Sequence, residues 1–247
     1  MNTSRFVAGT LNLWGDMRLD EREPALRAFF AASAPDLLGV QELTPHLLTI
    51  LESALPDHER VRDDTLPGWT GESNLFWARD RFHALEHGAE PFGALEPNRR
   101  VFWVRLAPRE NETRTLLFAT VHLTACLYEP ETSTGRNPRP GQVTVAAESL
   151  LRVARPDEPI LFLGDFNEDE LTFWRMERAG FSEVNAALGR SPQPTSPSFP
   201  LPGRMPAVDD WIYFRGPLQP MSFDVAHCAS PGLPPSDHRP VLATFRW

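Results

Sequence analysis

Polar side chains recur in this sequence at the points where short apolar segments end. They combine carboxylates, amides and imidazoles, namely Asn12, Glu42, His122, Asp165, Asn167, Asp210, Asp237 and His238. Carboxylate and amide oxygens bind hard divalent cations, and carboxylate and imidazole groups transfer protons. Polar groups at strand ends converge at one rim of a sheet, where sites are usually built. The pattern therefore favours one polar site assembled from distant parts of the chain.

Each of these residues also has a simpler structural explanation when it is taken alone. Glu42 would be a surface or helix-start carboxylate, and His122 a satisfied, partly buried histidine. A turn, a cap or an ordinary strand exit would account for Asn12, for Asp165 with Asn167, for Asp210 or its neighbour Asp209, and for Asp237 with His238. The complete series in this order is far less expected by chance than any single member, which favours the shared site.

The elements that must position these residues follow from hydrophobic spacing and from turn residues. The sequence predicts strands over residues 6–14, 37–40, 74–77, 99–106, 115–122, 160–163, 208–214, 221–226 and 241–245. It predicts helices over 19–32, 45–55, 142–153 and 169–179, with Thr44 as an N-cap before Pro45 and Gly180 as a terminator. Residues 128–141 and the proline-rich 191–206 are predicted loops. This mixture predicts α/β layers, with two packed sheets and helices outside them.

The composition limits the class of protein. The chain has 247 residues, of which 41% are hydrophobic and 23% charged, so one domain over 1–247 is expected rather than a disordered or fibrous chain. The net charge of −9 argues against affinity gained by covering a duplex with positive charge. All 24 basic residues are Arg, so lysine chemistry is excluded.

Cellular context is predicted from short signals. No run of 18 or more apolar residues occurs, which argues against a membrane partner, and the first residues lack a secretory signal pattern. We therefore expect a cytoplasmic protein, and we expect it to be a monomer. Cys126 and Cys228 are the only cysteines, so one disulfide is conceivable, but they form no C-x-x-C metal spacing.

Six local motifs, taken in order, resemble those of the endonuclease/exonuclease/phosphatase superfamily, the fold of deoxyribonuclease I. They are Thr10-Leu11-Asn12, Gln41-Glu42, Val121-His122-Leu123, Leu163-Gly164-Asp165-Phe166-Asn167, Asp210-Trp211-Ile212 and Ser236-Asp237-His238-Arg239-Pro240. The resemblance covers residues 6–246. Two weaker motifs agree with it: residues 72–79 resemble a family strand with an acidic partner for the first catalytic histidine, and residues 139–142 resemble a helix opening. The resemblance implies a four-layer αββα sandwich, with two packed mixed β-sheets flanked by helices.

The resemblance also implies roles for the polar residues. A Mg²⁺ or Mn²⁺ cofactor would be held chiefly by Glu42, with Asn12 and Asp237 completing or ordering its shell. The lack of His and Cys in that set argues against zinc. Asp165 would accept a proton from the attacking water or orient it, and Asn167 would fix the water or the phosphate.

Two histidines complete the implied catalytic set. Asp210 would hold His238 in one tautomer, so that His238 donates to the phosphate or acts as the base. Glu72 would steady His122, which would donate to the phosphate as its charge builds. Family members differ on whether an Asp165-type or a His238-type residue is the base, so both assignments stay open.

The implied function is a metal-dependent phosphoesterase that hydrolyses phosphodiester bonds by water attack. Its expected partner is a phosphoester substrate, with single-stranded nucleic acid or nucleic-acid ends favoured. A small-molecule phosphodiester or phosphomonoester is the second candidate. A catalytically silent binding member of the same fold, and a coincidental motif in a structural or interaction protein, are the further alternatives.

Other residues are candidates for substrate contacts around the site. Trp14, Trp69 and Phe92 lie in or near predicted loops, where they would stack on bases or anchor the core. Arg99, Arg100, Arg136 and Arg139 are candidates for gripping extra phosphates. The sequence departs from several family nucleases in one respect. Its two tyrosines, Tyr128 and Tyr213, lie outside any family motif, so tyrosine-assisted phosphate binding is not expected.

Overall fold

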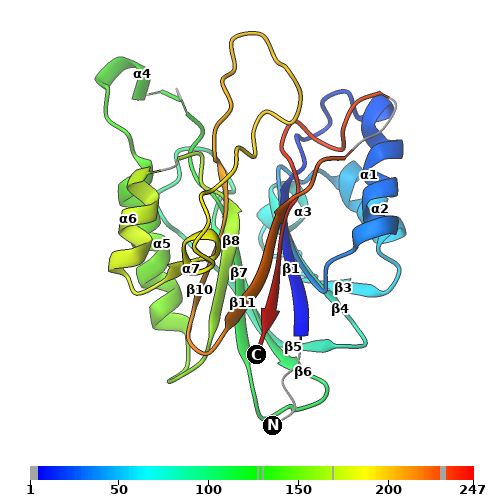
Figure 1. The fold of residues 1–247 in the computed structure, drawn as a ribbon, viewed down its shortest axis with the longest axis vertical. Helices are drawn as coiled ribbons and strands as arrows, with labels where there is room; N and C mark the ends of the chain where they lie inside the picture. The colour runs from blue at the N-terminus through cyan, green and yellow to red at the C-terminus, as the bar shows by residue number, and fades with distance from the viewer. Residues whose placement is uncertain (1–4, 127, 130, 169, 229–231) are drawn as a thin grey trace.

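Two six-stranded mixed β-sheets pack face to face, and helices cover their outer faces (Figure 1). The computed structural model describes residues 5–126, 128–129, 131–168, 170–228 and 232–247. The layers follow the order helix, sheet, sheet, helix, so the predicted four-layer αββα sandwich is confirmed. Within the described ranges, no helix combines the length and apolar character needed to cross a membrane.

The first sheet has the strand order β11-β12-β1-β2-β4-β3. Its strands are β11 (Gln219–Val225), β12 (Val241–Arg246), β1 (Arg5–Asn12), β2 (Leu37–Gln41), β4 (Ser73–Ala78) and β3 (His58–Arg60). Strands β1 and β2 run parallel, and the other neighbours run antiparallel. Its outer face is covered by α1 (Leu19–Ser33) and α2 (Pro45–Ala54) (Figure 1).

The second sheet has the order β5-β6-β7-β8-β10-β9. Its strands are β5 (Phe82–Glu90), β6 (Val101–Pro108), β7 (Leu116–His122), β8 (Ile160–Asp165), β10 (Asp210–Arg215) and β9 (Ser182–Glu183). Strands β7 and β8 form its parallel pair. Helices α5 (Arg139–Val153) and α6 (Glu170–Arg178) cover its outer face, and the short helices are α3 (Gly68–Gly71), α4 (Glu131–Thr134) and α7 (Val184–Ala187) (Figure 1).

Burial on both faces explains why the central strands are short, continuous apolar segments. Every residue of β2, β4, β7 and β8 is buried, as expected for strands covered by a helix layer on one side and a sheet on the other. One apolar cluster fills the space between the sheets, with Phe102, Phe118 and Leu163 among its members. Two further apolar clusters lie on the outer faces of the sheets. One packs the second sheet against α5 and α6, and the other packs the first sheet against α1 and α2.

Most predicted elements form close to their predicted bounds. Thr44 caps α2, because its Oγ1 accepts a hydrogen bond from the Leu47 N–H at 3.1 Å. Helix α5 begins at Arg139 rather than at 142, since a proline is tolerated in the first turn of a helix. Helix α6 begins at Glu170, and the predicted first residue, Asp169, lies outside the described residues. Strands β3 and β5 were not predicted, because both are edge strands rich in exposed polar residues.

The parallel pair of β7 and β8 depends on a glycine at the end of β8. Gly164 has a φ of +143°, and a Cβ built on it would lie 2.0 Å from the Val121 carbonyl oxygen. Only glycine lets the two strand ends approach this closely without displacement of the backbone. Gly164 therefore fixes the position of the next residue, Asp165.

We predict that Gly164→Ala lowers the free energy of unfolding by about 1–3 kcal/mol, the usual cost of a side chain in such a backbone conformation. The free energy of unfolding from urea denaturation checks this value. Gly141→Ala in α5 is the matched control, since a Cβ there meets no atom within 4 Å. It should raise the stability by roughly 0.5–1 kcal/mol. Equal stability of the two variants would contradict the packing argument.

Candidate active site

The ends of three neighbouring strands place three predicted site residues at the same level of the second sheet. In the register of the sheet, Asp165 of β8 lies opposite His122 of β7 on one side and Asp210 of β10 on the other. The first sheet contributes Asn12, which ends β1. This end of the sandwich carries the proline-rich loop and the segment before β12 (Figure 1).

Asp165 is the centre of the resulting network. Its Oδ2 accepts a hydrogen bond from Asn12 Nδ2 at 2.8 Å and lies 3.4 Å from His122 Nε2 and 3.9 Å from His238 Nε2. Its Oδ1 accepts from the Asn167 N–H at 2.9 Å. Burial alone would raise the pKa of Asp165, but the positive charges of His122 and His238 and these hydrogen bonds hold it below its usual value. Asp165 is therefore an ionised carboxylate.

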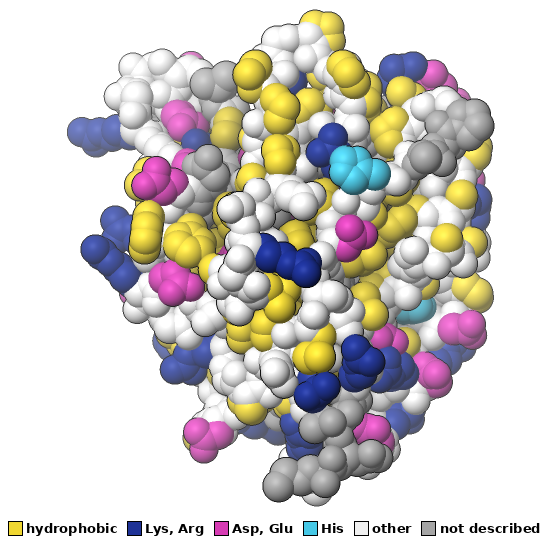
Figure 2. Space-filling view, in the orientation of Figure 1, with side chains coloured by type: hydrophobic (Ala, Val, Ile, Leu, Met, Phe, Trp, Pro, Cys, Tyr) yellow, Lys and Arg dark blue, Asp and Glu magenta, His cyan; other side chains and the backbone are white. Residues whose placement is uncertain are grey.

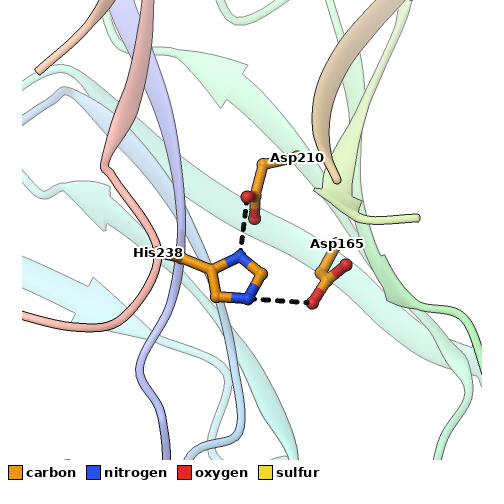
Figure 3. Close-up of side chains that lie close together, drawn as sticks. All are labelled: Asp165, Asp210 and His238. Atoms are coloured by element: carbon orange, nitrogen blue, oxygen red, sulfur yellow. Dashed lines mark hydrogen bonds and ion pairs between the residues drawn. The ribbon is translucent and has the colours of Figure 1, made fainter. Parts of the chain in front are cut away.

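His238 forms a carboxylate–imidazole pair with Asp210 (Figure 3). The Nδ1 of His238 donates to Asp210 Oδ2 at 2.7 Å, and Nε2 faces Asp165. Burial lowers the pKa of His238, but the carboxylates of Asp210 and Asp165 raise it well above its ordinary value. The geometry also distinguishes Asp210 from the adjacent acid Asp209. Asp210 reaches the imidazole, whereas burial and the charge of Asp165 raise the pKa of Asp209 to about 7.

A second carboxylate–imidazole pair lies on the other side of Asp165. His122 Nδ1 lies 2.9 Å from Glu72 Oε1, and Glu72 immediately precedes β4. Burial and the nearby Arg99 lower the pKa of His122, but Asp165 and Glu72 raise it above its ordinary value. Both imidazoles thus present Nε2 to the same buried carboxylate, which favours their protonated forms.

Glu42 and Asp237 form the part of the site nearest the first sheet. Asn12 Nδ2 donates to Glu42 Oε1 at 3.0 Å as well as to Asp165, so one amide orients two carboxylates. Burial, together with the negative charge of Glu42, raises the pKa of Asp237. This repulsion indicates two carboxylates that share one region.

The backbone at the site is strained in two places. Glu42 has a φ of +53° and Asn167 a φ of +49°, in the left-handed region that few non-glycine residues adopt. Such strain persists where the surroundings fix the conformation, and it clusters at functional sites. The Asn167 amide donates to the Leu123 carbonyl at 3.2 Å, which fixes this side chain beside Asp165.

Two groups of side chains offer metal-binding atoms. Asp165, Asp210 and His238 each place a ligand atom within 4.8 Å of the others' ligand atoms. However, the His238–Asp210 hydrogen bond already occupies one ligand atom of each of these two residues. Glu42 and Asp237 instead offer carboxylate oxygens alone, the donor type that Mg²⁺ and Mn²⁺ prefer.

Two residues for which the sequence suggested no supporting role, Thr195 and Gln41, hold these side chains in place. The Thr195 hydroxyl accepts hydrogen bonds from the Asp209 and Asp210 N–H groups, both at 3.1 Å. Gln41 Nε2 donates to Thr120 Oγ1 at 2.8 Å and so joins the two sheets below the site. Thr195 lies in the proline-rich loop, where no local pattern marks it, whereas Gln41 had a signal in its position next to Glu42.

The structure gives other roles to several residues that the sequence suggested for substrate contacts. Arg99 pairs with Glu72 and Glu96, so its charge is neutralised internally. Arg139 is buried and likewise pairs with two acids, Glu131 and Glu168.

The aromatic candidates also prove mainly structural. Trp69 and Phe92 are buried in the core, so they are core residues rather than stacking platforms. Trp14 remains half-buried and lies against Phe199. Tyr213 is buried within β10, and both cysteines are free.

The geometry agrees with the comparisons with known proteins. A model of the Endonuclease/Exonuclease/phosphatase family matches residues 9–238. The chain belongs to this family. No curated protein sequence matches it significantly.

Solved structures of other family members share its fold. The D. rerio TDP2 complex with single-strand DNA product has a TM-score of 0.79 at 20% identity, covering 98% of this chain and 99% of that one. The mannosyl-6-phosphatase of Bacteroides thetaiotaomicron has a TM-score of 0.78 at 17% identity, covering 97% and 98%. The human Nocturnin catalytic domain with bound sulfate has a TM-score of 0.73 at 18% identity, covering 99% and 96%.

We predict that Asp210→Asn lowers the pKa of His238, because the variant removes the carboxylate that favours the imidazolium. NMR titration of the metal-free protein measures this pKa directly.

The elevated pKa of His238 also makes the stability of the protein depend on pH. The contribution of His238 is fully present below the unfolded-state value near 6.5 and is lost as the pH rises through the higher folded-state pKa. This fall in the free energy of unfolding should flatten in Asp210→Asn and persist in Asp224→Asn, which changes an exposed acid of β11. An unchanged His238 pKa in Asp210→Asn would contradict the assignment.

Proposed function

We propose that this family member hydrolyses phosphodiester bonds of nucleic acid, at strand ends or in short single strands, with Mg²⁺ or Mn²⁺ as its cofactor. The observation that carries the proposal is the ionised, buried Asp165 placed between two carboxylate–imidazole pairs. A protein that only binds its partner has no evident need for such an arrangement, because burying these charges costs stability.

The side chains of the site divide the proton chemistry between them. Asp165 orients the attacking water and accepts its proton, since it stays ionised in this environment. His122 and His238, protonated and held by Glu72 and Asp210, donate through Nε2 to phosphate oxygens as their charge increases. Asn167 fixes the water or the phosphate beside Asp165.

The metal is assigned to Glu42 and Asp237, with Asn12 orienting the Glu42 carboxylate. Burial and, to a smaller extent, the negative charge of Glu42 raise the pKa of Asp237, and a cation between the two carboxylates would offset that repulsion, which supports this assignment. When bound, the cation would neutralise part of the phosphate charge. To hold the cation, the alternative group of Asp165, Asp210 and His238 would need a neutral His238, whereas the carboxylates around that imidazole raise its pKa.

Charge on the surface supports a short substrate rather than a long duplex. The chain carries a net charge of −9. On the face drawn in Figure 2, arginine and acidic side chains are interspersed and form no continuous basic band. Duplex binding depends on many simultaneous phosphate contacts, which this face does not offer. Among proteins of the same fold, TDP2 was solved with single-strand DNA product.

A small-molecule phosphoester is the second candidate substrate. The mannosyl-6-phosphatase shares the fold over nearly all of this chain. The same site residues serve either substrate, so the surrounding loops decide between them.

We expect Mg²⁺- or Mn²⁺-dependent cleavage of labelled single-stranded oligonucleotides, and we expect EDTA to abolish it. Asp165→Asn should lower the rate by roughly 10²–10⁴-fold, the usual contribution of a positioned proton acceptor. Asp157→Asn, at an exposed acid that precedes β8 at the end of the strand opposite Asp165, is the matched control and should keep wild-type turnover. A folded wild-type protein that cleaves neither oligonucleotides nor a panel of small phosphoesters would refute the proposal.

Glu42→Gln should raise the Mg²⁺ concentration needed for half-maximal activity by about tenfold or more, because a carboxylate ligand becomes a neutral amide. His238→Asn should lower the maximal rate with a smaller effect on that concentration. Metal titrations of both variants against the wild type separate the two metal assignments. The opposite pattern would place the metal between Asp210 and His238.

A further inference from the structure

A cavity of about 270 Å³ borders His238, between the segment that follows β11 and the segment that precedes β12. Its walls are formed by Ser198 of the proline-rich loop, by residues 226–228 after β11, and by residues 234–235 and 238–240 before β12. None of the proposed steps of hydrolysis uses this space. Its position next to a residue that contacts the reacting phosphate makes it the natural place for a neighbouring part of the substrate.

Hydrogen bonds between its walls give this cavity a fixed shape. The Ser198 N–H donates to the Asp237 carbonyl at 2.6 Å, so the proline-rich loop is attached to the catalytic segment. The Ala226 N–H donates to the Pro240 carbonyl at 2.8 Å, which joins the other two walls. A preformed cavity binds its ligand without the cost of ordering loops.

The charge of the lining selects an anion. Arg239, His227 and His238 line the cavity, and none of the described residues that line it is an acid, although the chain carries 33 acidic residues against 24 basic ones. The backbone N–H of Arg239 donates to the Thr195 carbonyl at 2.7 Å, and one hydrogen bond, from Nη1 to the Pro194 carbonyl at 2.8 Å, holds the guanidinium itself. A guanidinium fixed in this way favours phosphate, because its planar donors match phosphate oxygens.

We propose that this cavity is a subsite for a second phosphate group of the substrate, bound by Arg239 and His227. The inference rests on the proposed hydrolysis at Asp165, since it defines which phosphate reacts. The volume lies just below the roughly 300–1,000 Å³ of typical ligand sites, so it suits a phosphate with its sugar rather than a longer chain. The preferred substrate therefore carries a second phosphate one sugar away from the scissile one. A nucleic-acid end and a sugar bisphosphate both present this chemistry.

The kinetic test compares substrates with one reacting bond and different numbers of phosphates. The dinucleotide TpT is compared with its 5′-phosphorylated and 3′-phosphorylated forms. We expect one phosphorylated form to have a kcat/KM roughly tenfold higher than TpT, and Arg239→Gln to abolish that preference. His227→Asn, an exposed position that tolerates substitution, should reduce the preference in the same direction. Arg190→Gln, an exposed arginine that does not line the cavity, is the matched control and should keep the preference.

A binding measurement separates this inference from the proposed hydrolysis. Calorimetric titration in the Asp165→Asn background with Mg²⁺ compares thymidine 3′,5′-bisphosphate with thymidine 5′-monophosphate. A second arm compares glucose 1,6-bisphosphate with glucose 6-phosphate. Tighter binding of one bisphosphate, lost on adding Arg239→Gln, supports the subsite even if turnover fails, and the responsive arm identifies the source. The inference is overturned if neither bisphosphate binds more tightly than its monophosphate, or if Arg239→Gln weakens all four ligands equally.

Discussion

The site depends on one buried, negatively charged carboxylate that two imidazoles and an amide compensate. A lone carboxylate at the depth of Asp165 would be protonated, because burial strongly disfavours its charged form. It stays ionised because His122, His238 and Asn12 surround it. Glu72 and Asp210 in turn raise the pKa values of those histidines, which favours their protonated forms. The protonation state of each member is therefore a property of the whole network.

The two sheets divide the site between them. Asp165, His122 and Asp210 lie side by side on the second sheet, in positions fixed by strand register and by the close approach at Gly164. Asn12 ends β1 of the first sheet, and Glu42 immediately follows β2. Packing the two sheets against each other thus brings the acids proposed to bind the metal against the groups proposed to transfer protons, and the inter-sheet bond from Gln41 to Thr120 lies just below them.

Much of this arrangement could be predicted from the sequence, because the central strands are buried on both faces. Their apolar segments end abruptly at polar residues, so both the strands and the site residues were evident. The pairs of Glu72 with His122 and of Asp210 with His238 followed from the family resemblance, and the structure brings both together. Their catalytic roles stay predictions.

The features that were missed depend on contacts between segments far apart in the sequence. Edge strands β3 and β5 carry exposed polar residues, so they lack the apolar alternation of a half-buried strand. Thr195 supports Asp210 from a loop without regular structure, and no local pattern marks such a residue. The charges of Arg99 and Arg139 suggested phosphate contacts, whereas only the folded chain shows the acids that neutralise them.

The central claim is that Glu42 and Asp237 hold the cation while Asp165 and the two histidines handle protons. Anomalous scattering from a crystal grown with Mn²⁺ tests this division most directly, because it locates the ion independently of turnover. The account predicts a single strong peak in contact with the Glu42 and Asp237 carboxylates, with the His238–Asp210 hydrogen bond intact. A peak in contact with Asp210 and His238 instead would contradict it.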